Sequence, residues 1–158
     1  MLNFIFVNGG LDINNAKLMK EFSIKRFMIA VNSNFAVPTC IAHPFLPCGV
    51  NNLEEQLSVF TDKDYFDCFV AAKNKGVSIE MSSAFIDKRK EKFSRFDESG
   101  FAFEYVRMMK IAKKAGVKVQ IGSDAHSVDK FFVHSEIIKF LKSRVGEIPP
   151  YLIFEERI

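Results

Sequence analysis

An eight-residue pattern that recurs along the chain constrains its fold more than any other feature. Residues 73–80 read KNKGVSIE, and residues 113–120, forty positions later, read KKAGVKVQ. In both segments, basic residues stand where they complement the C-terminus of a helix, and a glycine supplies the left-handed position that ends it. The β-branched residues that alternate after each glycine indicate a short buried strand. The repeat therefore predicts two successive units in which a helix runs into a strand.

The same pattern extends the prediction to the rest of the chain. We expect strands near residues 26–31, 39–42, 77–81 and 117–122. We expect helices from a capping box at residues 61–64 through Asn74, over residues 101–115 and over residues 133–145. Because strands and helices alternate, the fold class is α/β, with parallel strands and flanking helices. Four such units are about half of a barrel of the ~250-residue type, so we expect an open remnant or a fold that needs a partner.

Length and composition limit the class of protein. With 158 residues, 48% of them hydrophobic, the chain is long enough for one buried core, and we expect a single domain over residues 1–158. A net charge of +3 without a basic arm argues against nucleic-acid binding. Three cysteines without a CxxC pair fit a reducing cytoplasm. Residues 1–7 resemble neither a signal peptide nor a membrane span, so we expect a soluble cytoplasmic protein with no membrane partner.

Asp124 and His126 form the sharpest candidate site. They follow the strand expected at residues 117–121, and loops after parallel strands gather at one face. A carboxylate and an imidazole two residues apart can point into one pocket, where they suit zinc, manganese or iron. The alternative is that Asp124 caps a following helix and that His126 is a surface residue, which is the commoner arrangement for an isolated pair.

His43 and Glu80 hold equivalent positions on other strands. His43 ends an apolar strand that Pro44 stops, and Glu80 lies where residues 77–81 run into a polar loop. A lone histidine there is more often a core residue than a ligand, but its position matches that of Asp124 and His126. We expect Glu80 to orient a ligand histidine or to hold the loop.

Two other groups of charged or titratable residues have plainer interpretations. Arg89 and Lys90, in the loop after Glu80, would suit a phosphate, whereas a solvated charged loop is the alternative interpretation. His134 falls within a predicted helix, and we interpret it as structural or exposed.

Three motifs in this order resemble the later motifs of the polymerase and histidinol phosphatase (PHP) family: IAHP at residues 41–44, IEMSS at 79–83 and GSDAH at 122–126. The basic pair is similar to that of the small stand-alone phosphatases of the family, and residues 7–12 and 26–31 can be aligned with the same branch. The resemblance implies a distorted (β/α)7 barrel that holds up to three metal ions and hydrolyses phosphate esters. It implies metal ligands at His43, Asp124 and His126 and phosphate contacts at Arg89 or Lys90.

The departures from this family are equally informative. The early histidine motifs of the family have no counterpart, the bridging glutamate would fall at or before Met1, and another ligand histidine falls at Asn32 or Ser33. We therefore expect a partial barrel without its N-terminal units, and a metal site that is incomplete or binds no metal. One hypothesis is a phosphoesterase, impaired by these losses, that acts on a small phosphate ester. The other is a non-catalytic remnant that self-associates or binds a partner, and either form is expected to be a homo-oligomer.

Overall fold

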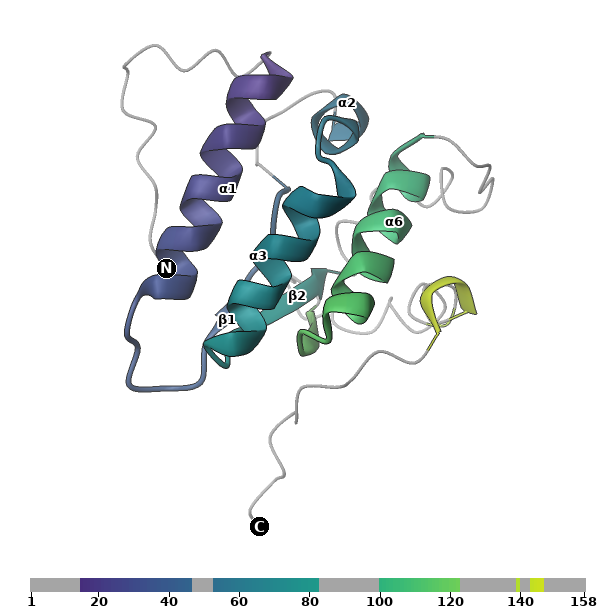
Figure 1. Ribbon diagram of the computed structural model, residues 1–158. Helices are drawn as coiled ribbons and strands as arrows, with labels where there is room; N and C mark the ends of the chain where they lie inside the picture. Colours follow the sequence, from purple (N-terminus) through teal and green to yellow (C-terminus); the bar gives the residue numbers. More distant parts are fainter. Residues whose placement is uncertain (1–14, 47–52, 83–99, 123–138, 140–142, 147–158) are drawn as a thin grey trace, which may run out of the picture.

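The computed structural model describes residues 15–46, 53–82, 100–122, 139 and 143–146. Within this part of the chain, three parallel strands form one sheet in the order β1-β2-β3. The strands are β1 (Cys40–Ile41), β2 (Ser78–Ser82) and β3 (Val119–Gly122). The fold is therefore mixed α/β, with a small parallel sheet and flanking helices, as the alternation of patterns predicts (Figure 1).

The first described helix contradicts a prediction. Residues 26–31, expected as a strand, lie within helix α1 (Ala16–Asn32), which the Asn15 side chain caps by accepting the Leu18 N–H at 3.1 Å. The apolar run at residues 27–31 has no periodicity of its own, so by itself it is compatible with either a strand or a helix. The helix is set by its buried residues, which recur at helical spacing: Ala16, Met19, Phe27 and Val31.

Helix α2 (Leu53–Ser58) leads into α3 (Asp62–Asn74), whose predicted capping box is confirmed. The Thr61 hydroxyl accepts the Asp64 N–H at 3.1 Å, and the Asp64 carboxylate accepts the Thr61 N–H at 2.8 Å. Lys20 of α1 also binds the Asp64 carboxylate, at 2.9 Å. The start of α3 is therefore tied both to its own first turn and to α1.

The repeated pattern forms two matching helix ends. After α3, Gly76 has a φ of 68°, its N–H donates to Lys73 O at 3.0 Å, and the Val77 N–H donates to Ala72 O at 2.9 Å. After α6 (Gly100–Ala115), Gly116 has a φ of 74°, and the N–H groups of Gly116 and Val117 make the equivalent hydrogen bonds. Both are Schellman motifs, in which glycine takes the left-handed position without steric cost. The predicted helix-to-strand units are confirmed.

The helices α1, α3 and α6 lie side by side over one face of the sheet (Figure 1). Ile79 and Met81 of β2 belong to the hydrophobic core that these helices share. Because successive residues of a strand point to opposite faces, Ser78, Glu80 and Ser82 occupy the other face. The helix predicted at residues 101–115 is confirmed, whereas most of that predicted at residues 133–145 lies outside the described residues.

Candidate functional site

The candidate site lies at the carboxyl end of the sheet, the side where the three parallel strands end. The last residue of β2, Ser82, pairs with the last residue of β3, Gly122, whereas β1 ends earlier, at Ile41, which pairs with Ile79 of β2. Of the site residues predicted from the sequence, His43 and Glu80 belong to the described part of the chain. The others lie outside the described residues: Arg89, Lys90, Asp124 and His126.

His43 begins a tight turn with unusual backbone geometry. The Leu46 N–H donates to the His43 carbonyl at 3.2 Å, which closes a four-residue turn around Pro44 and Phe45. Proline in the second position and a left-handed third residue are the arrangement of a type II turn, in which glycine or asparagine usually stands third. Here the third residue is Phe45, with a φ of 62°, and His43 itself has a φ of 28°. Left-handed backbone at a bulky residue is strained, so other contacts must hold it.

An aromatic cluster holds this turn in place. Phe45, only 6% exposed, stacks on Phe27 with ring centroids 4.8 Å apart, and its edge-to-face neighbours are Phe60, Tyr65 and Phe69 at 5.2, 5.3 and 5.8 Å. These rings come from α1, from α3 and from Phe60 in the short connection between α2 and α3. The cluster therefore fixes the Phe45 ring from several elements and overcomes the preference of its backbone for another conformation.

The Glu80 side chain, on β2, contacts both this turn after β1 and the end of β3. Its Oε2 accepts the main-chain N–H of His43 at 2.8 Å. Its Oε1 lies so close to Gly122 that a Cβ at that position would collide with it. The Glu80 side chain therefore lies between the end of β1 and the end of β3, and it contacts the main chain of His43.

Two groups near Glu80, one buried and one half-buried, have raised pKa values. Burial raises the pKa of the Tyr105 phenol on α6, and the Glu80 charge raises it further, although a hydrogen bond with the Ser82 main chain acts in the opposite direction. Burial also raises the pKa of the Cys40 thiol, and the Glu80 charge raises it further. A hydrogen bond with the Ser78 side chain lowers this pKa, but by less. A thiol of raised pKa is a poor nucleophile, so the half-buried Cys40 is not a candidate catalytic residue.

The described residues do not by themselves form a metal site. Among them, no group of three or more histidines, cysteines, aspartates and glutamates could hold a metal ion. His43 is the one predicted ligand that they contain, and a site with three protein ligands requires Asp124 and His126 as well. The donor set of two imidazoles and a carboxylate fits zinc, manganese or iron in its chemistry.

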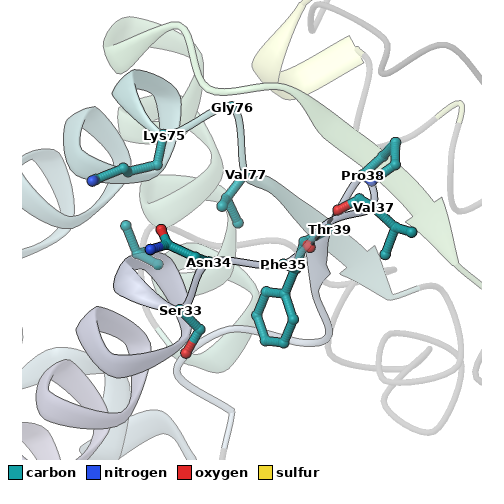
Figure 2. A pocket seen from close by; sticks show the side chains of 10 residues that line it. Ser33, Asn34, Phe35, Val37, Pro38, Thr39, Lys75, Gly76 and Val77 are labelled. Carbon is teal, nitrogen blue, oxygen red and sulfur yellow. Dashed lines mark hydrogen bonds between the residues drawn. The ribbon is translucent and has the colours of Figure 1, made fainter.

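A cavity of about 260 Å³ lies at the opposite, amino end of the sheet. Figure 2 shows it between the loop that follows α1 and the turn from α3 into β2. Its lining residues are Val31, Ser33, Asn34, Phe35, Val37, Pro38, Thr39, Lys75, Gly76 and Val77. Ser33, which the family alignment places at a ligand histidine, lies here, after a helix. The strand expected at residues 26–31, which was aligned with the same family, is replaced by part of α1.

Sequence reasoning missed three residues that shape the candidate site. Phe45 centres the aromatic cluster, Tyr105 lies beside Glu80, and Gly122 makes room for the Glu80 carboxylate. The signal available for Gly122 was a glycine at the last strand position, directly before the Asp-Ala-His segment. Nothing local in the sequence marks Phe45 or Tyr105 among eighteen phenylalanines and three tyrosines.

In comparisons with known proteins, no protein-family model, curated protein or solved structure matches the chain. The family resemblance therefore rests on the order and setting of its three motifs. Within the described ranges, no helix has both the length and the apolar character needed to cross a membrane.

Proposed function

We propose that this chain is a metal-dependent hydrolase of phosphate esters, of the PHP type, with His43, Asp124 and His126 as its metal ligands. The arrangement of the strand ends carries the proposal. The chain leaves β1 just before His43, and it leaves the parallel strand β3 just before Asp124 and His126. Segments that follow parallel strands of one sheet lie at the same end of it, which is where α/β proteins build their sites.

The chemistry follows from these residues. A bound divalent metal ion would lower the pKa of a water molecule and neutralise the oxygens of the ester. His43, Asp124 and His126 would hold the metal, while Arg89 and Lys90 would bind the phosphate oxygens through charge-assisted hydrogen bonds. In this proposal the three-stranded sheet belongs to a partial barrel, and the protein is a cytoplasmic homo-oligomer.

A second candidate is a non-catalytic protein that works through assembly on the same scaffold. The sheet itself favours it. Within the described residues, β1 and β3 each pair with β2 alone, so each has an outer side without a strand partner. Unpaired strand sides are templates for association with another chain. Sedimentation of the purified chain tests this candidate, since a monomer at all concentrations contradicts it.

Metal content measured together with phosphatase activity on a generic phosphomonoester tests the first proposal. We expect the purified chain to retain stoichiometric zinc, manganese or iron and to turn the ester over. His126→Ala and His43→Ala should lose both properties, because each removes one of three protein ligands.

His134→Ala is the matched control, since it removes a histidine outside the proposed ligand set. It should keep both metal and activity. Metal-free, inactive wild-type protein, or metal and turnover that persist in His126→Ala, would overturn the hydrolase proposal.

A further inference from the structure

Glu80 touches both segments that the proposed site needs. It lies on β2, the central strand, between β1 and β3. Its Oε2 accepts the His43 N–H at 2.8 Å beyond the end of β1. Its Oε1 faces Gly122 at the end of β3, where an added Cβ would collide with this oxygen and lie 2.7 Å from the carboxylate carbon. The two oxygens of one carboxylate thus face two different strand ends.

The identity of residue 122 supports a specific role. Gly76 and Gly116 need glycine because their φ angles are positive, 68° and 74°. Gly122 is not among the residues with positive φ, so its backbone conformation does not require glycine. What requires glycine there is the close approach of the Glu80 side chain, which any Cβ would displace.

The hydrogen bond from the His43 N–H to Glu80 gives a second reason for a specific role of Glu80. This N–H lies past the strand, where the pairing between β1 and β2 has ended, and a main-chain donor needs an acceptor. A carboxylate is a stronger acceptor than a carbonyl, and it meets a residue whose φ of 28° is strained. Aspartate, which is one methylene shorter, would not span the same distance from β2.

We infer that Glu80 is a positioning residue that ties the end of β1 to the end of β3, and that Gly122 lacks a side chain in order to admit it. The consequence for function rests on the proposed function: the contact would set how far His43 lies from Asp124 and His126, two and four residues beyond Gly122. The contact itself does not depend on activity and can be measured on metal-free protein.

A double-mutant cycle on the full chain tests the inference, with Glu80→Ala, Gly122→Ala and the combined variant. The first readout is hydrogen exchange at the His43 amide, followed by nuclear magnetic resonance without metal. Each single change should accelerate exchange about tenfold, because each removes a hydrogen bond to a charged acceptor. In the Glu80→Ala background, Gly122→Ala should add nothing, since the group with which it collides is gone.

Two matched variants separate this role from general destabilisation. Glu80→Gln keeps the side chain's length and an oxygen acceptor, so the His43 amide should stay protected while its proton resonance moves upfield. Gly116→Ala also places a Cβ at a glycine, but there the nearest side chain is that of Lys73. Its effect should simply add to that of Glu80→Ala. Additive effects of Glu80→Ala and Gly122→Ala on the His43 amide would overturn the inference.

A second readout, calorimetric titration with Mn²⁺, distinguishes this inference from the proposed function. Glu80→Ala should weaken Mn²⁺ binding about tenfold, as the loss of support behind metal ligands does. If wild-type protein binds none of Mn²⁺, Zn²⁺ and Fe²⁺ but the His43 amide shows the coupling, the hydrolase proposal fails and the role of Glu80 stands. If wild-type protein binds Mn²⁺ and the coupling is absent, the role of Glu80 fails.

Discussion

Where the amino end of the sheet uses glycine for left-handed backbone, at Gly76 and Gly116, the carboxyl end uses a histidine and a phenylalanine. At the amino end, each glycine closes a Schellman motif, and its conformation carries no steric cost. At the carboxyl end, His43 and Phe45 adopt angles that residues with side chains avoid, so their surroundings must impose these angles. The amino end follows local rules, whereas the carboxyl end is held by distant contacts.

Removal of the Phe45 ring should have the largest effect. Phe45→Ala leaves a cavity among four other aromatic rings and releases the left-handed turn, so we expect a loss of about 4 kcal/mol in the free energy of unfolding. Urea denaturation followed by circular dichroism measures it. Phe35→Ala is the control at the amino end, because that ring is 51% exposed, and it should change stability by less than about 0.5 kcal/mol. Equal losses in the two variants would break the contrast between the ends.

This contrast also explains how much the sequence could predict. The capping box at Thr61 and the glycines that end α3 and α6 act within a few residues, so a pattern in the sequence reports them directly. Strands β2 and β3 follow from the same units. The strand predicted at residues 26–31 was wrong because an apolar run carries no period, and the cap at Asn15 was the local signal that would have indicated a helix.

The contacts of the candidate site were harder to predict, because they join residues far apart in the chain. The parallel pattern indicates that His43 and Glu80 belong to one end of the sheet, and the structure places them in contact. That Glu80 binds the main chain of His43, and that Phe45 packs against α1 and α3, depends on tertiary packing. No sequence period reports such pairs, which are separated by 37 residues in the case of His43 and Glu80.

Arg107 of α6 tests the same comparison, because it binds the main chain at Phe60, a residue of the aromatic cluster. Its guanidinium pairs with Asp62 at 2.7 Å and with Glu104 at 2.7 Å, and it donates to the carbonyl of Phe60 at 2.8 Å. Arg107→Met keeps the aliphatic bulk but leaves these acceptors without their donor, so we expect a loss of about 2 kcal/mol in unfolding free energy.

Lys63→Met is the matched control for Arg107→Met. Lys63 pairs with Asp67 at 2.6 Å, but its side chain is 81% exposed, and exposed pairs contribute little. Its replacement should leave the urea midpoint unchanged. A loss in Lys63→Met as large as that in Arg107→Met would show that the position of the guanidinium between α2, α3 and α6 has no special importance.

A side chain added at the amino end tests the other half of the comparison. Gly76→Ala meets open space, with no atom within 4 Å of the new Cβ, so its cost comes from the φ of 68° alone. We expect a loss of about 1 kcal/mol in unfolding free energy. Gly76→Asn is the matched variant, and it should lose less, because asparagine tolerates left-handed backbone. No loss in Gly76→Ala would show that this end does not need glycine.

The smallest effect should come from the charge of Asp64, at the start of α3. Burial acts to raise the pKa of this carboxyl group, but hydrogen bonds from Thr61 and Lys20 outweigh it, so the net pKa lies below the ordinary value of 3.8. An acid whose pKa is lower in the folded state stabilises the fold above its unfolded pKa and loses this contribution as pH falls through the folded pKa. Asp64→Asn keeps an oxygen that can accept the Thr61 N–H but removes the charge. At pH 7 it should be less stable than wild type by under about 1 kcal/mol.

The difference between wild type and Asp64→Asn should shrink as pH falls from about 5 towards 2, because wild-type Asp64 becomes protonated over that range. Urea denaturation at several pH values measures it. Lys20→Met removes the partner on α1 and should reduce the same pH-dependent difference, since Lys20 binds this carboxylate at 2.9 Å. A difference that stays constant down to pH 2 would mean that the charge of Asp64 contributes nothing. The start of α3 would then depend on its capping hydrogen bonds alone, which are as local as the glycine at its other end.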